Sequence, residues 1–111
     1  SGIAAMSAHD LTLALDSFDQ VVEKAPGFAE GWNKRATVYY LMGEYNHSVR
    51  DIRQTLLLEP RHFGAMAGFA WILLRQRDFE MAEHVLRKAL SVNPFLVDVR
   101  RQLRTLMNRS G

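Results

Sequence analysis

The sequence contains no cysteine, and this absence excludes two ways of stabilising a small protein. Neither a disulfide framework nor a zinc site with cysteine ligands can form. Long apolar runs are also missing, since no stretch approaches the roughly 20 apolar residues that a membrane-spanning helix needs. We therefore expect a soluble protein with no signal peptide or transmembrane segment in this chain, whose compartment stays open.

A marked excess of one charge is missing as well. The chain has 14 Lys and Arg residues against 12 Asp and Glu residues, and its formal net charge is +2. This excess is too small for a dedicated polybasic tail. With 48% hydrophobic and 23% charged residues, the 111 residues fit one globular domain rather than a disordered segment.

The residue patterns of common catalytic and cofactor sites are absent from the sequence. The histidines show no metal-ligand spacing, and we expect them to be solvated or to cap helix ends. They are His9, His47, His62 and His84. Gly64 and Gly68 form no phosphate loop, no serine or threonine lies in a nucleophile elbow, and we place the acidic residues on outer faces without paired carboxylates. The sequence predicts no enzyme activity, no cofactor and no metal site.

Prolines are few, and their spacing defines the organisation of the chain. Pro26, Pro60 and Pro94 lie 34 residues apart. The units Ala29–His62 and Phe63–Leu96 then agree in character at equivalent positions. The matched pairs are Trp32 with Met66, Ala36 with Ala70, Tyr39 with Leu73, Tyr45 with Phe79, Ser48 with Ala82, Ile52 with Leu86, and Thr55 with Ala89. A fixed interval of this size is typical of stacked supersecondary units.

Apolar residues recur at spacings of three and four, which predicts helices, and no segment shows the alternation of a half-buried strand. The expected helices span about residues 10–25, 29–42, 45–58, 63–75, 79–91 and 96–108. Asp10 is the expected N-cap of the first helix, and Gly43 fits the left-handed position after the second. Small Ala36 and Ser48 should let two helices approach closely. The fold class that we predict is all-α.

These positions resemble the tetratricopeptide repeat, a helix-turn-helix unit of 34 residues with the pattern W-x2-L-G-x2-Y, A-x3-F and P. The first unit reads Trp32, Arg35, Ala36, Tyr39, Ser48, Ile52 and Pro60, and the second reads Met66, Phe69, Ala70, Leu73, Ala82, Leu86 and Pro94. Arg35 replaces the leucine of the pattern, which leaves the local packing open. Arg77 replaces the turn glycine, and we expect strain in that turn. The resemblance implies a right-handed superhelix of antiparallel helix pairs.

The same resemblance implies one domain, residues 1–111, of about 2.5 repeats and a C-terminal capping helix. Its parts are a partial repeat 1–28, the repeats 29–62 and 63–96, and the helix 97–109. That last helix carries a narrow apolar stripe, which suits a terminal cap and also fits the first helix of a further repeat. The stripe consists of Val99, Leu103, Leu106 and Met107.

The N-terminal end of the sequence has a wide apolar surface. Ile3–Ala8 matches only the last part of a helix, so Leu11, Leu15 and Val22 should lose their cover. We expect the chain to be a fragment of a longer protein. We also expect that it self-associates through this end, or that Ile3–Ala8 folds back over it.

One further stripe remains on the first helices after the core positions are assigned. In proteins of the resembled family this stripe lines the concave groove, where partner peptides bind. The predicted groove residues are Asn33, Thr37, Tyr40, Leu41, Ala67, Trp71, Leu74, Arg75 and Arg101, with Thr105 following on the last helix. We expect a scaffold that binds a partner peptide or helix with apolar anchors and some acidic character. The alternative is that Tyr40 and Trp71 pack against neighbouring repeats.

Other functions stay open at this point. RNA binding through arginine-bearing faces is the alternative, but nucleic acid is not the expected partner. Glu80 and Glu83 lie near Arg87 at helical spacings that favour pairing, which indicates a mixed-charge surface. Self-assembly of the repeats is a third possible function. A clamp for chaperone C-termini is not indicated, because the matching positions supply no set of cations. These positions are Ile3, Gly64 and Gly68, or Thr37, Gly68, Asp98 and Gln102.

Overall fold

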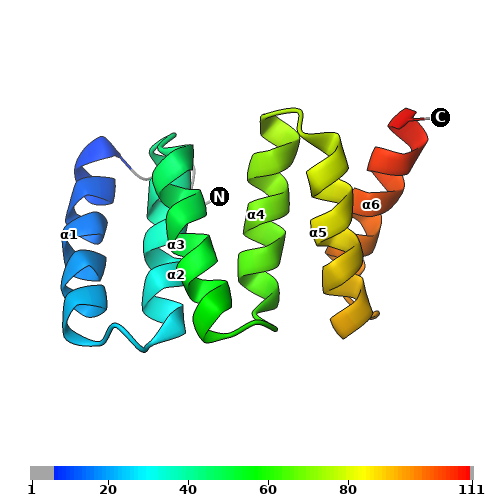
Figure 1. Cartoon of the computed structure of the whole chain (residues 1–111). Coiled ribbons are helices and arrows are strands. Elements are labelled where there is room, and N and C mark those ends of the chain that lie inside the picture. Colours follow the sequence, from blue (N-terminus) through cyan, green and yellow to red (C-terminus); the bar gives the residue numbers. More distant parts are fainter. Residues whose placement is uncertain (1–6, 111) are drawn as a thin grey trace. The chain divides into compact units, whose positions relative to one another are not determined.

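The computed structural model describes residues 7–110, and within this range every regular element is an α-helix (Figure 1). The helices are α1 (Ala8–Lys24), α2 (Ala29–Leu41), α3 (Tyr45–Leu58), α4 (Phe63–Arg75), α5 (Phe79–Val92) and α6 (Val97–Ser110). The predicted all-α class is confirmed. None of the described helices combines the length and the apolar character needed to cross a membrane.

The chain divides after Pro60 into two compact units. Unit 1 is Ser1–Pro60 and carries α1, α2 and α3, and unit 2 is Arg61–Gly111 and carries α4, α5 and α6. In unit 1, α2 packs against both α1 and α3. In unit 2, α5 packs against both α4 and α6. Each unit is therefore a set of three helices around a central one, and the partition into repeats of a single domain stays a prediction.

The start of α1 differs from the expectation. Ser7 is the N-cap, because its Oγ accepts a hydrogen bond from the Asp10 backbone N–H at 3.1 Å. The Asp10 carboxylate in turn accepts one from the Ser7 N–H at 3.3 Å. This reciprocal pair is a capping box, and it makes Asp10 the third residue of the helix rather than its cap. Ala8 thus belongs to α1, and the rest of the predicted preceding segment, Ile3–Met6, lies outside the described residues.

The predicted loss of cover on α1 holds only in part. Val22 is buried, so the expectation is wrong for this residue, whereas Leu11 and Leu15 are half-buried. Helices α1 and α2 come very close together at Gly31, where an added Cβ would stand 2.8 Å from Val21 Cγ1. This contact explains why one side of α1 is covered within unit 1. Self-association through the other side stays a prediction.

Most of the aligned repeat positions are buried in both units. They are Ala36, Ser48, Ile52 and Thr55 in unit 1, and Met66, Ala70, Leu73, Ala82, Leu86 and Ala89 in unit 2. The Ser48 hydroxyl donates a 2.7 Å hydrogen bond to the Ala36 carbonyl, which confirms the close approach of α2 and α3. The aromatic members of the pattern are only half-buried, namely Trp32, Tyr39, Tyr45, Phe69 and Phe79.

The two turns inside the helix pairs have the same hydrogen bonds. Glu44 N donates to the Tyr39 carbonyl and Asp78 N donates to the Leu73 carbonyl, each at 2.9 Å. Beside these bonds, Gly43 N donates to the Tyr40 carbonyl at 3.0 Å and Arg77 N donates to the Leu74 carbonyl at 3.1 Å. Each turn is therefore a Schellman motif, in which the residue after the helix C-cap takes a left-handed conformation. Gly43 has φ 79° and Arg77 has φ 61°. The left-handed region disfavours side chains with a Cβ, so the predicted strain at Arg77 is confirmed.

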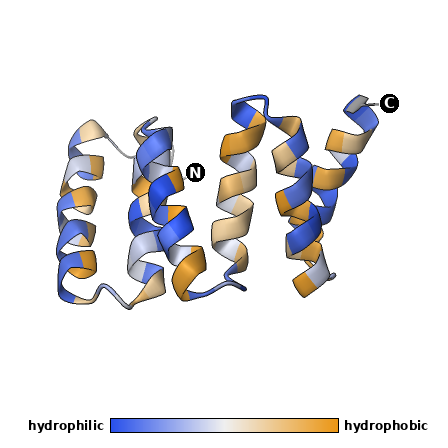
Figure 2. Ribbon diagram, in the orientation of Figure 1, coloured by the Kyte–Doolittle hydropathy of each residue, from blue (hydrophilic) through white to orange (hydrophobic). Residues whose placement is uncertain are grey.

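Helices α4 and α6 of unit 2 differ in composition. Figure 2 shows α4 with far less hydrophilic colour than its neighbours, and Arg75 is its single charged residue. Helix α6 carries four arginines, Arg100, Arg101, Arg104 and Arg109, and one acidic residue, Asp98. Unit 2 therefore contains one apolar helix and one strongly basic helix.

Candidate functional site

A hollow of about 380 Å³ in unit 2 gathers four of the residues expected in the groove. We call it the α4–α6 hollow, because α4, α5 and α6 all contribute to its lining. The lining residues are Trp71, Leu74, Phe79, Asp98, Arg101, Gln102, Thr105, Leu106 and Arg109. Trp71, Leu74, Arg101 and Thr105 were expected from the sequence.

The register of α4 explains why Trp71 reaches the hollow. Its neighbours Ala70 and Ile72 are both 0% exposed, so they occupy the packed side of the helix, while Trp71 is 52% exposed. Leu74 lies three residues further on and therefore shares the face of Trp71. An aromatic side chain left half-exposed beside a leucine is the kind of surface that a partner covers.

The register of α6 supplies the opposite wall of the hollow. The lining residues of α6 recur at spacings of three and four, which places them along one side of the helix. They are Asp98, Arg101, Gln102, Thr105, Leu106 and Arg109. Leu106 is buried and contributes an apolar floor, whereas the two arginines are exposed and contribute a basic rim.

Both rim arginines make weak contacts within unit 2. Arg101 Nη1 lies 3.8 Å from Asp98 Oδ1, and the two side chains are 72% and 92% exposed. The Arg109 guanidinium lies 4.4 Å from the centroid of the Phe79 ring, and Arg77 approaches the same ring at 5.6 Å. An exposed ion pair and an exposed cation–π contact each contribute little stability, so both guanidinium groups can turn toward a ligand.

Gln102 is the unusual polar residue of the lining. Its Nε2 atom is buried and, within the part of the chain that the structure describes, has no hydrogen-bond partner. Leaving a buried donor unpaired costs about 1–3 kcal/mol, so such groups are uncommon in proteins. Besides the two arginines, the lining therefore includes a residue whose buried donor is unpaired within the described residues.

The predicted groove residues of unit 1 lie on α2 and make local contacts. Asn33 Nδ2 donates to Glu30 Oε1 at 3.0 Å, and the Thr37 hydroxyl donates to the Asn33 carbonyl at 3.1 Å. The Tyr40 ring lies 5.6 Å from the Tyr45 ring of α3, and Tyr40 and Leu41 are half-buried. Tyr40 therefore takes part in packing between α2 and α3.

The remaining groove residues lie on α4. Ala67 is half-buried and Arg75 is exposed, and neither belongs to the lining of the α4–α6 hollow. The continuous groove over both repeats stays a prediction.

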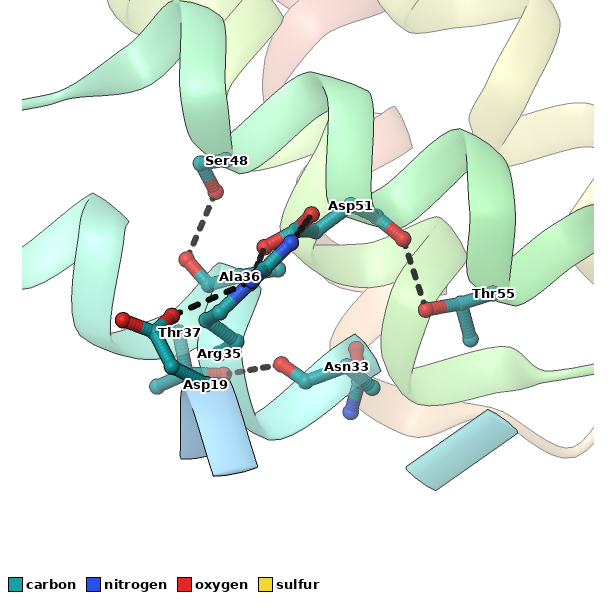
Figure 3. A network of polar contacts seen from close by, with 8 residues as sticks. All are labelled: Asp19, Asn33, Arg35, Ala36, Thr37, Ser48, Asp51 and Thr55. Carbon is teal, nitrogen blue, oxygen red and sulfur yellow. Dashed lines mark hydrogen bonds and ion pairs between the residues drawn. The ribbon is translucent and has the colours of Figure 1, made fainter. Parts of the chain in front are cut away.

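The sequence reasoning missed a charged network in unit 1, which is centred on the residue that departs from the repeat pattern (Figure 3). Arg35 Nε and Nη2 donate to the two carboxylate oxygens of Asp51 at 2.8 and 2.9 Å. Arg35 Nη1 donates to Asp19 Oδ1 at 3.1 Å. The network joins α1, α2 and α3 through one guanidinium.

This network corrects the expectation that the acidic residues lie on outer faces without paired carboxylates, because Asp19 and Asp51 meet at one guanidinium. The Asp51 side chain is 2% exposed, and it shares Arg35 with Asp19, whose side chain is 47% exposed. A signal for it was present in the repeat alignment. The positions of Arg35 and Asp51 hold apolar Phe69 and Val85 in the next repeat, so the two members of the pair change together.

Aromatic side chains flank the Arg35 guanidinium. It lies 5.1 Å from the Trp32 ring centroid and 5.7 Å from that of Tyr39. The hydrogen bond to Asp51 raises the pKa of Arg35 above its ordinary value, and burial raises the pKa of the Tyr39 hydroxyl. Trp32 Nε1 donates to the Pro26 carbonyl at 2.9 Å. The network thus ties together the three helices of unit 1.

Other polar residues have structural roles. His62 Nδ1 accepts a hydrogen bond from Ala65 N at 3.0 Å and caps α4, as expected. Arg87 Nε donates to Glu83 at 2.8 Å, which confirms that predicted pairing. Among the described residues, no three His, Asp or Glu side chains form a group that could hold a metal ion.

Comparison with known proteins gives consistent matches. The family model described as tetratricopeptide repeat matches residues 64–95. A TPR repeat-containing protein of Rhizobium etli is 40% identical over 81 residues, which are 73% of this chain and 40% of that protein. The chain thus spans less than half the length of this relative.

Solved structures that resemble the chain include two TPR domains. The first TPR domain of Spaghetti (RPAP3), bound to the HSP90 peptide SRMEEVD, has a TM-score of 0.83 at 15% identity, over 91% of this chain and 82% of that one. The Sgt2 TPR domain from Aspergillus fumigatus has a TM-score of 0.81 at 20% identity, over 97% of this chain and 73% of that one. At these identities the likeness establishes the fold.

Proposed function

Because this chain belongs to the tetratricopeptide repeat family, we propose that it is a non-catalytic scaffold that binds a peptide or helix of a partner protein. The α4–α6 hollow is the part of the proposed groove that anchors the partner. The observation that carries this proposal is the half-exposed Trp71 beside Leu74 over an apolar hollow.

A partner bound in the α4–α6 hollow would cover tryptophan and arginine side chains. Tryptophan and arginine are the residue types that most often dominate protein–protein interfaces, and here they line the same hollow. The volume of about 380 Å³ lies at the low end for ligand pockets, which suits the anchoring side chain of a peptide. A partner that covers Trp71 removes apolar surface from water, which favours binding.

The related fold of the RPAP3 domain, which is bound to the peptide SRMEEVD, supports a peptide partner. We do not propose the same ligand for this chain. The positions that would form a clamp for a C-terminal carboxylate hold Thr37, Gly68, Asp98 and Gln102. An aspartate at such a position repels a carboxylate, so SRMEEVD serves as a negative probe.

RNA binding is less favoured by the structure than peptide binding. Arg35, Arg87 and Arg101 each contact a carboxylate, which lowers the positive charge available for phosphates. Binding that depends on phosphate contacts would weaken steeply as salt is raised.

The proposed function is tested by selecting displayed random 12-residue peptides on the full chain and measuring the affinity of synthetic copies by fluorescence anisotropy. Trp71→Ala should weaken the selected peptides by at least about 30-fold, as expected for an interface hot spot. Phe95→Ala is the matched control, because Phe95 is also an exposed aromatic residue of unit 2, at 82%, but does not line the hollow. Equal affinities for Trp71→Ala and Phe95→Ala would contradict the proposal, provided that circular dichroism shows both variants folded.

A further inference from the structure

The spacing of the two rim arginines carries the proposed function one step further, to the chemistry of the partner. We infer that the α4–α6 hollow selects a segment with one bulky apolar side chain flanked on both sides by carboxylates about 12 Å apart. This inference rests on the proposed function. It adds that the partner segment has its groups in the order acidic residue, apolar anchor, acidic residue. Binding of a partner does not by itself require this order.

The distance follows from the geometry of α6. Arg101 and Arg109 are separated by eight residues, and a rise of about 1.5 Å per residue places their backbones about 12 Å apart along the helix. The lining residues between them are Gln102, Thr105 and Leu106. The apolar floor therefore lies between two cations, and a ligand anchored on it has one cation at each end.

This distance translates into a spacing in the partner sequence. An extended segment rises about 3.4 Å per residue, so its two acidic residues would be three or four positions apart. A helical segment would need seven or eight positions for the same distance. In both forms the apolar anchor lies between the acids.

Both cations have contacts that a carboxylate can replace. Arg101 faces Asp98 at 3.8 Å in an exposed pair, and Arg109 lies over the Phe79 ring. A ligand carboxylate would give each guanidinium a charge-assisted hydrogen bond, which is stronger than either present contact. Asp98 lines the hollow beside Arg101, so it competes with a ligand carboxylate and lowers the affinity.

Gln102 adds a third point of recognition. Gln102 lines the hollow, and its buried Nε2 has no hydrogen-bond partner within the described residues. When the Gln102 side chain turns toward a segment lying along the hollow, a main-chain carbonyl of that segment can accept this hydrogen bond. Pairing a buried donor on binding favours the complex, because the cost of leaving it unpaired disappears.

The test uses the full chain and a library of displayed random 12-residue peptides, selected on the wild type and counter-selected on Trp71→Ala. Trp71-dependent peptides should carry an acidic residue on each side of a bulky apolar one. In synthetic copies, changing either acid to its amide should weaken binding about tenfold, and so should Arg101→Gln or Arg109→Gln.

Two variants separate this inference from a general attraction of acidic peptides. Arg100→Gln removes the same charge from the next position of α6, outside the lining, and should change the affinity less than about twofold. Asp98→Asn should strengthen binding by about two- to fivefold, a gain that a damaged fold cannot produce.

These outcomes test the inference and the proposed function separately. Trp71-dependent peptides without flanking acids, or equal losses for Arg100→Gln and Arg101→Gln, overturn the inference and leave the proposed function intact. Absence of any Trp71-dependent peptide overturns both.

Discussion

Replacing Arg35 by leucine restores the residue that the tetratricopeptide pattern has at this position, and we nevertheless expect the change to destabilise the protein. Arg35 is the cation that neutralises Asp51, whose side chain is 2% exposed. Removing one partner of a buried ion pair leaves an uncompensated charge, which typically costs about 3–5 kcal/mol. For a domain of this size that loss lowers Tm by more than about 10 °C.

The compensating double variant is the decisive control. Arg35→Leu combined with Asp51→Val introduces the leucine of the pattern and the valine that the next repeat has at Val85. Replacing a buried ion pair by apolar residues is often neutral or stabilising, so the double variant should regain most of the lost stability. Asp19→Ala, at the more exposed end of the network, should cost less than about 1 kcal/mol.

The assay is guanidinium-induced unfolding followed by circular dichroism, with the free energy of unfolding extrapolated to water. The expected order of stability is wild type close to the double variant, then Asp19→Ala slightly below, then Arg35→Leu far below. A loss of less than about 1 kcal/mol for Arg35→Leu would refute the reasoning. So would a double variant that is no more stable than the single one.

Three further changes test other features of the fold. Trp32→Ala should lower the free energy of unfolding by about 3 kcal/mol, because it removes packing and the hydrogen bond to the Pro26 carbonyl. Trp71→Ala should lower it by less than about 1 kcal/mol, because Trp71 is half-exposed. Equal losses in a denaturant titration would place Trp71 in the core. Arg77→Gly should raise the free energy of unfolding by about 0.5–1 kcal/mol, because the backbone φ of 61° at this position suits glycine. A lower Tm for this variant would show that the lost contact between Arg77 and Phe79 outweighs the relief of strain. Gln102→Leu should raise the free energy of unfolding of the unliganded protein by about 1 kcal/mol in the same titration, and it should weaken peptide binding. A loss of stability would mean that the Gln102 amide has a hydrogen-bond partner in solution.

The sequence was sufficient to predict those features that depend on periodicity. The 34-residue interval placed Ala36, Ser48 and Ile52 at buried positions, and α3 and α4 have the predicted bounds. Strain at Arg77 was also predictable, because the turn before it in the chain has glycine at the same position.

Features that depend on the meeting of separate helices were not predicted. Asp51 was assigned to an outer face because a charge on an amphipathic helix is normally solvated, and only the approach of α2 makes it buried. The same holds for the α4–α6 hollow. Trp71 and Arg101 were selected from their register, but Phe79 and Arg109 come from different helices, and their contact has no signature in local spacing.

The alternation between a charged pair in one repeat and an apolar pair in the next has a consequence for how the chain assembles. Repeats of similar sequence can mispair during folding, with a helix of one repeat docked on the complementary helix of another. Helix α2 docked on α5 would place Arg35 against Val85, and α4 docked on α3 would place Phe69 against Asp51. Each wrong pairing buries an unmatched charge, whereas each correct pairing does not. We infer that the Arg35–Asp51 pair favours the correct pairing of α2 with α3 during folding. The Arg35→Leu, Asp51→Val double variant lacks this ion pair, so it should refold with an additional slow phase from chains with mispaired helices. Single-phase refolding at the wild-type rate would show that the ion pair has no role in selecting the correct helix pairing.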